Sequence, residues 1–282
     1  MKMDLENSPE LINPILLYAF EGWNDAGESA STAIDQLIDS WQAEPVHSLD
    51  PELFYDFQVN RPHVSTREDG SREIEWPETS IYVARIPLAN RDVVLLRGIE
   101  PNNRWKTFSD EIIAVVKHLN IQMAIAIGSL LSDTPHTRSI PVTTTSNHPE
   151  FPETMNFLPS TYEGPTGILG VLGEALTANG VPNGSMWAQV PHYAAGSPCP
   201  KATLALLSRI EEVLDIAVDL DDLTEAAAEW ESDVNSMIED DEELTNYVSQ
   251  LETTSDNVSD EEIETSDIGG EFERYLRRRN SN

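Results

Sequence analysis

The chain has 282 residues, of which 39% are hydrophobic, and it carries 50 acidic against 17 basic side chains, a formal net charge of −33. Such a charge repels phosphate backbones and anionic lipid, which argues against non-specific binding to nucleic acid or to membranes. The single cysteine, Cys199, excludes an intramolecular disulfide, and neither a signal peptide nor a membrane-spanning run is evident. We therefore expect a cytoplasmic protein.

Short apolar runs alternate with amphipathic stretches along residues 1–218, which predicts strands and helices in turn. Several runs are rich in Val, Ile and Leu without strict alternation, as buried parallel strands are. The sequence therefore predicts an α/β fold, a three-layer α/β/α sandwich around a mostly parallel sheet. The predicted strands are 15–20, 46–49, 81–87, 93–97, 123–128 and 186–190, and the predicted helices are 29–41, 105–119, 167–178 and 200–217.

Two long segments interrupt this alternation. Residues 50–79 are polar and contain several prolines and glycines, so we expect an excursion that carries a loop or a hairpin. Residues 132–165 are rich in Ser, Thr and Pro and are predicted to form a long loop. Long ordered loops in such folds often carry function.

The C-terminal part differs sharply in charge, because residues 211–271 hold 23 acidic residues and no Lys or Arg. Apolar residues recur there at 4-3 spacing, which predicts an amphipathic acidic helix packed on the body or on a short partner helix rather than a free coiled coil. The run EDDEE at 239–243 is expected to divide it into two helices. We thus divide the chain into a body (1–218), an acidic α-helical extension (219–252) and a largely disordered tail with a basic amphipathic end (253–282). The apolar positions are Leu223, Ala227, Trp230, Val234, Met237, Leu244, Val248 and Leu251, with Asp241 at the interrupted one.

The first candidate site is GWNDAG at 22–27, between the first predicted strand and helix. A phosphate-binding loop would need nearby cations, but Glu21, Asp25 and Glu28 surround the turn and no Lys or Arg lies between residues 2 and 61. Asp25 and Glu28 instead fit an N-cap and an N3 residue. We interpret the stretch as a structural turn, which leaves Asn24 and Asp25 as weaker ligand candidates.

The second candidate is SDTPHTR at 132–138, at the carboxyl end of a predicted strand, where open parallel sheets bind ligands. Asp133 would orient His136, and Arg138 would hold an anion beside Thr137. The alternative is a self-satisfied loop, in which Asp133 accepts backbone N–H bonds and pairs with Arg138. The residues leave both alternatives open.

Two further stretches complete the set. Gly164 and Gly167 precede and open a glycine-rich helix, whose N-terminus either receives an anion or packs closely against a neighbour. His192 and Tyr193 follow the last predicted strand, where His192 would face the same crevice as His136. The histidine spacing matches no metal-ligand signature, so we expect no metal.

Together, GWNDAG, DTPHTR, GPTGI and VPHY resemble, in this order, the proteasome assembly chaperone 2 (PAC2) family, and the acidic helical C-terminus resembles its actinobacterial branch. The resemblance covers roughly residues 12–218. It implies an α/β/α sandwich similar to phosphorylase-like folds, self-association and a protein-binding or assembly role. It carries over no catalytic residue.

Two functions are compatible with these observations. The first is a non-enzymatic, assembly-chaperone-like scaffold that binds proteins and itself, with a trimer as one such oligomer, and without a cofactor. The second is a binder of an anion or nucleoside-like molecule, or a hydrolase- or phosphorylase-type enzyme, so whether the chain is an enzyme stays open. The catalytic candidates for the second function are Asp25, Asp133, His136 and His192. The ligand-binding candidates are Asn24, Asp25, Asp133, His136, Thr137, Arg138, Gly164, Gly167, His192 and Tyr193.

Overall fold

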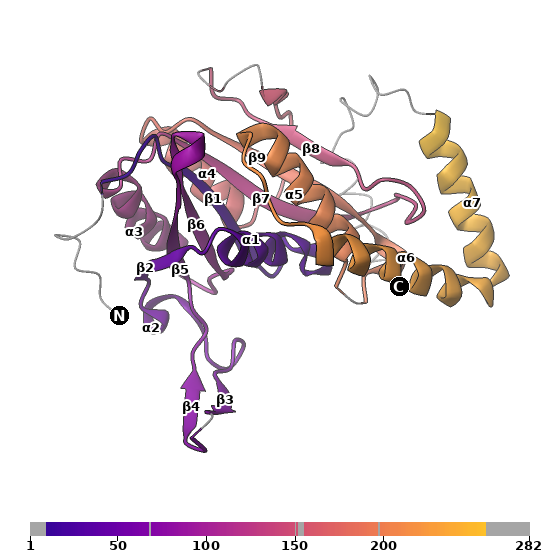
Figure 1. Ribbon diagram of the computed structural model, residues 1–282, viewed down its shortest axis with the longest axis horizontal. Helices are drawn as coiled ribbons and strands as arrows, with labels where there is room; N and C mark the ends of the chain where they lie inside the picture. The colour runs from indigo at the N-terminus through magenta and orange to yellow at the C-terminus, as the bar shows by residue number, and fades with distance from the viewer. Residues whose placement is uncertain (1–9, 68, 150, 152–154, 197, 258–282) are drawn as a thin grey trace.

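A computed structural model describes residues 10–257 apart from positions 68, 150, 152–154 and 197 (Figure 1). The strands are β1 (Ile15–Glu21), β2 (Glu44–Ser48), β3 (His63–Thr66), β4 (Arg72–Glu75), β5 (Ser80–Ile86), β6 (Arg91–Ile99), β7 (Met123–Ser132), β8 (Val142–Thr145) and β9 (Asn183–Pro191). The helices are α1 (Ser29–Ser40), α2 (Pro51–Phe54), α3 (Trp105–His118), α4 (Ile168–Ala178), α5 (Pro200–Leu214), α6 (Asp221–Glu239) and α7 (Glu242–Asn257).

The central sheet has the strand order β2-β5-β6-β1-β7-β9-β8. Its four middle strands, β6, β1, β7 and β9, run parallel, whereas β5, β2 and β8 add antiparallel margins. All six predicted strands are present, and the mostly parallel sheet is confirmed. Strand β8 was not predicted, because it lies in the Ser/Thr-rich segment that was expected to be a loop.

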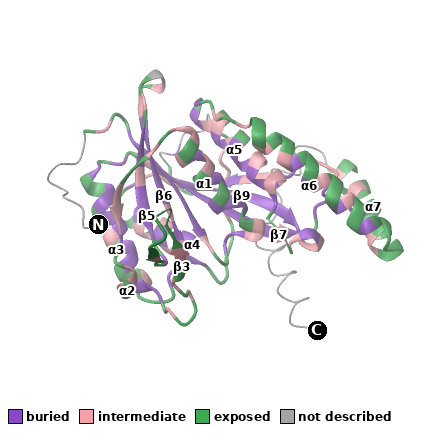
Figure 2. Cartoon of the chain, turned by 60° about the horizontal axis from the view of Figure 1, so that its bottom comes forward, coloured by how far each residue is buried: buried purple, intermediate pink, exposed green. Residues whose placement is uncertain are grey.

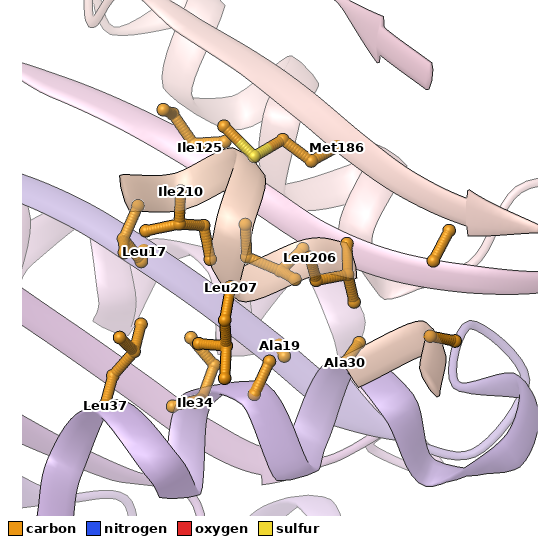
Figure 3. Packing of buried hydrophobic residues seen from close by; sticks show 14 of the residues in the cluster. Leu17, Ala19, Ala30, Ile34, Leu37, Ile125, Met186, Leu206, Leu207 and Ile210 are labelled. Carbon is orange, nitrogen blue, oxygen red and sulfur yellow. The ribbon is translucent and has the colours of Figure 1, made fainter. Parts of the chain in front are cut away.

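Alternate side chains of the buried strands enter two cores, which confirms the three layers. Leu17 and Ala19 of β1 pack with α1 and α5 on one face of the sheet, where Figure 3 shows them beside Leu206 and Leu207. The neighbouring residues of β1 pack with α3 and α4 on the other face. Each fully buried Leu contributes about 1.5–3 kcal/mol relative to its exposed state, so these faces hold the helices on the sheet.

The polar excursion at 50–79 contains the short helix α2 and the hairpin β3–β4, as expected. This hairpin is a separate two-stranded sheet that projects from the body (Figure 1). Val64 and Ile74 lie directly opposite each other on its two strands, and each is 54% exposed. An isolated two-stranded hairpin is marginally stable in water, and the apolar pair of this one is exposed to solvent.

The acidic extension forms two helices that meet at Asp240 and Asp241, so the predicted division is confirmed. Helix α6 packs on α5, and its outward side is exposed (Figure 2). Met237, which belongs to the predicted stripe, is 51% exposed, and Ile238 is buried in its place. The helix lies on the body rather than in a supercoil, so its buried face follows 3.6 residues per turn instead of the 3.5 of a heptad. The buried residues of α6 are Ala227, Trp230, Val234 and Ile238.

Helix α7 continues to Asn257, five residues beyond the predicted end of the extension at 252. The remainder of the predicted disordered tail, from residue 258, lies outside the described residues. Within the described part of the chain, each helix is too short or too polar to cross a membrane.

Candidate functional site

The turn after β1 is organised by the carboxylate of Asp25. Its Oδ1 atom accepts hydrogen bonds from the backbone N–H groups of Ala30 (2.7 Å) and Ser31 (3.2 Å), and from the hydroxyl of Ser129 on β7 (3.4 Å). The side chain of Asp25 therefore caps helix α1, but from outside the N-cap position that was predicted for it, which Glu28 occupies. Glu28 does not take the predicted N3 position, because it lies exposed in a left-handed conformation just before the helix.

The second oxygen of Asp25, Oδ2, is buried and has no hydrogen-bond partner among the described residues. Burial raises the pKa of Asp25 above its ordinary value, although the N–H groups at the start of α1 oppose this change. The bonds of the carboxylate go to α1 and β7. Asp25 thus does not pair with His136 or Arg138, which a chemical role in the strand-end crevice would have required.

A different carboxylate, that of Glu100, lies at the N-terminus of α4. Its Oε1 atom accepts hydrogen bonds from the backbone N–H of Ile168 (2.9 Å) and from the side chain of Asn24 (3.3 Å). A Cβ atom on Gly167 would lie 2.3 Å from the Asn24 amide nitrogen, so this glycine permits close packing. The carboxylate of Glu100 therefore occupies the anion position that was considered at the N-terminus of α4. Gly164 lies exposed in the loop before this helix.

The remaining candidates come together at the carboxyl ends of β7 and β9. We call them the strand-end cluster. The backbone places them there because one group follows β7 and the other follows β9, its parallel neighbour. The cluster consists of Asp133, His136, Thr137, Arg138, His192 and Tyr193.

His136 is fully buried at the centre of this cluster. The Tyr193 hydroxyl lies 2.8 Å from both its backbone nitrogen and its Nδ1 atom, and Nε2 lies 3.1 Å from Oδ1 of Asn235 on α6. Since an amide oxygen only accepts, Nε2 carries the ring proton and Nδ1 accepts from the tyrosine. Burial lowers the pKa of His136 and raises that of Tyr193 to about 12. Both ring nitrogens of His136 therefore have partners within the protein.

Helix α7 binds the outer part of the cluster through polar contacts, which include an ion pair between Arg138 and Glu252 at 3.3 Å. The Tyr247 hydroxyl donates to Asp133 (3.0 Å), and the Thr137 hydroxyl donates to Glu252 (2.5 Å). Arg138 donates through Nε and one terminal nitrogen to the two oxygens of Asp256, at 2.8 and 2.9 Å. The chain's own acidic extension therefore covers the cluster.

These contacts differ from the side-chain pairings predicted for the loop. Asp133 lies 3.4 Å from Nδ1 of His192 rather than beside His136, and Arg138 pairs with α7 rather than with Asp133. The ring of Tyr247 also stacks edge-on against His192 at 5.6 Å between centroids. The proposed orientation of His136 by Asp133 is accordingly wrong.

Sequence reasoning missed the residues that complete the cluster. Asn235, Tyr247, Glu252 and Asp256 lie about a hundred positions or more from their partners. The absence of Lys and Arg from 211–271 was a partial signal, because those carboxylates can find cations only outside this segment, on the body or among the arginines at 274 and 277–279. Among the described residues, no group of three or more His, Cys, Asp or Glu side chains could hold a metal ion.

A hollow of about 820 Å³ lies between β8 and α5, beside the cluster rather than over it. Two cations, Lys201 and Arg209, line it. Both are already paired, Lys201 with Glu231 of α6 and Arg209 with Glu212. The hollow thus offers no unpaired cation to an anionic ligand.

Comparison with known proteins agrees with the motif set, since the model of the PAC2 family matches residues 19–238. The chain belongs to the PAC2 family. No curated protein matches it.

Solved structures of PAC2 relatives place the chain in the actinobacterial branch. A PAC2 family protein from Streptomyces avermitilis is 47% identical with a TM-score of 0.78, covering 83% of this chain and 99% of that one. A proteasome-assembly chaperone homologue from Mycobacterium tuberculosis is 46% identical with a TM-score of 0.74 and the same coverage. A protein of unknown function from the same organism is 28% identical with a TM-score of 0.81, covering 95% of this chain and 92% of that one.

Removing the Tyr193 hydroxyl tests the buried half of the cluster. Tyr193→Phe leaves two His136 nitrogens without their partner, so we expect a loss of about 1–3 kcal/mol in the free energy of unfolding. Tyr247→Phe is the matched control, because its hydroxyl bonds to an exposed carboxylate and should contribute less than about 1 kcal/mol. Urea denaturation measures both. Equal losses would contradict a structural role specific to His136.

The buried carboxylate of Asp25 predicts a pH dependence. Because its pKa is raised above 3.8 in the folded state, the native protein binds this proton more tightly than the unfolded chain, and the resulting stabilisation is lost as pH rises through the folded pKa. Asp25→Asn removes this ionisation. The unfolding free energy of the wild type minus that of the variant should therefore fall as pH is raised from 3.8 through the folded pKa.

Glu28→Gln, at an exposed position of the same turn, controls for the loss of one negative charge. Chemical denaturation at each pH gives the three curves. A difference between wild type and Asp25→Asn that grows with pH would mean that the carboxylate is stabilised rather than destabilised by its surroundings.

Proposed function

We propose that this chain is a cytoplasmic, assembly-chaperone-like protein that binds other proteins and associates with itself. The observation that carries the proposal is the exposed apolar pair of Val64 and Ile74 on the hairpin β3–β4. A second observation supports it: the polar strand-end cluster is engaged by α6 and α7 rather than open to a small molecule.

The hairpin has the composition of a contact surface. Val64 and Ile74 form an exposed apolar pair across its strands. Near its base, Trp76 is 48% exposed and stacks on Phe57 at 4.9 Å between ring centroids. Exposed apolar patches of this kind mark protein interaction sites. We propose that the hairpin binds a second copy of the chain, because burial of its apolar residues would stabilise a ribbon that is marginal alone; a trimer is one oligomer compatible with this.

The rival function, binding of an anion or nucleoside-like molecule or catalysis on one, requires free polar groups at the strand ends. The groups proposed for it have internal partners. Arg138 is paired with Glu252 and Asp256, both nitrogens of His136 are bonded, and Glu100 lies at the N-terminus of α4. These contacts favour the protein-binding function.

For the partner, we propose subunits of an actinobacterial proteasome, in line with the chaperone homologue that is 46% identical. Purified chain mixed with unassembled proteasome subunits should form a complex and raise the rate of ring assembly, measured by native mass spectrometry over time. An unrelated protein of similar negative charge controls for electrostatic effects. An assembly rate unchanged by the chain, with no complex detected, would refute the proteasome as partner.

Self-association has its own test. The double variant Val64→Thr and Ile74→Thr keeps β-branched residues in the strands but removes the exposed apolar pair, so it should shift the chain toward monomer in light scattering. Val59→Thr is the matched control, because Val59 is 68% exposed but lies outside the hairpin strands. A wild-type chain that is strictly monomeric, or a double variant with the wild-type mass, would refute this use of the hairpin.

A further inference from the structure

Helices α6 and α7 are held on the body in different ways. Helix α6 buries four apolar side chains and adds two polar links, Lys201 with Glu231 and His136 with Asn235. Helix α7 buries only Val248 and Leu251. Its ion pairs involve Arg138, whose side chain is 38% exposed, and Asp256, which is 56% exposed. Exposed pairs add little stability, so α7 detaches more easily than α6.

The contacts of α7 come from one face of the helix. Tyr247, Val248, Leu251, Glu252 and Asp256 follow the spacing of successive helical turns. The complementary surface on the body carries an acceptor, a hydroxyl and a cation in the same order: Asp133, Thr137 and Arg138. Any helix with this face can therefore occupy the surface, and the α7 helix of a second copy carries the same face.

The connection between α6 and α7 coincides with the interrupted position of the apolar stripe. Asp241 holds the bend, because its Oδ1 atom accepts the backbone N–H groups of Glu243 and Leu244, each at 3.0 Å. At 4-3 spacing this position would otherwise carry an apolar residue between Val234 and Val248. If the bend opened, residues 221–257 would form one helix that carries α7 away from its own body.

We propose that α7 exchanges between two copies of the chain, so that the α7 helix of each copy binds the Asp133–Thr137–Arg138 surface of the other. Such an exchange reuses contacts that already exist within one chain and needs no new interface. The proposal rests on the self-association proposed above, but it uses a different surface from the hairpin.

Complementary charge reversals test the exchange. In the Arg138→Glu variant, two negative side chains face each other where Arg138 pairs with Asp256 in the wild type. In the Asp256→Arg variant, two positive side chains face each other there. When the two variants are mixed, the α7 helix of each variant meets a surface of opposite charge only on the other variant. We expect the mixture to contain a larger fraction of 1:1 dimer, of twice the 31.4 kDa chain mass, in light scattering than either variant alone. A mixture that contains only monomers would overturn the proposal.

Both variants also carry Val64→Thr and Ile74→Thr, so that failure of the exchange is told apart from failure of the hairpin contact. The charge reversals fall on partly exposed side chains, and circular dichroism confirms that each variant is folded. A second variant, Asp241→Leu, removes the cap and completes the apolar stripe. It should raise the dimer fraction, while Asp240→Ala, which keeps the cap, should not; equal dimer fractions in the two would also overturn the proposal.

Discussion

The buried imidazole of His136 requires a hydrogen-bond partner from the C-terminal extension. A buried ring with two nitrogens needs two partners. One is supplied by Tyr193 at the end of β9 and the other by Asn235 on α6. Because an unsatisfied buried group costs about 1–3 kcal/mol, the body and α6 depend on each other. Helix α6 therefore lies over the carboxyl ends of β7 and β9, and α7 contacts the more exposed residues of the strand-end cluster.

Carboxylates of the chain itself lie at the N-termini of three helices, where the partial charge is positive. Asp25 lies at the N-terminus of α1, Glu100 at that of α4 and Asp241 at that of α7. Helix N-termini attract anions, and in this acidic chain intramolecular carboxylates fill those positions. The motifs were expected to meet in one crevice. They instead form three separate groups: the Asp25 cap of α1, the Glu100 cap of α4, and the strand-end cluster.

Sequence patterns predicted the fold well where burial decides structure. Six apolar runs became strands, and the amphipathic stretches between them became helices, because side-chain periodicity reports directly on what must be buried. Strand β8, with the sequence VTTT, was missed because it is polar and exists through pairing with β9. The motif residues at the ends of β7 and β9 were brought together as expected from parallel topology. Their partners on α7 were not predictable, because no local pattern connects Arg138 with a carboxylate 118 residues later.

Because the chain is made from its N-terminus, the contact between His136 and Asn235 forms late in synthesis. Its partner on α6 lies 99 residues toward the C-terminus, and chains fold from the N-terminal side as they leave the ribosome. The sheet and helices α1–α5 can thus be complete while α6 and α7 are still being made. During that interval the Nε2 atom of His136 lacks its partner Asn235 and the Arg138 side chain lacks Glu252 and Asp256, and α6 and α7 supply these partners when they dock.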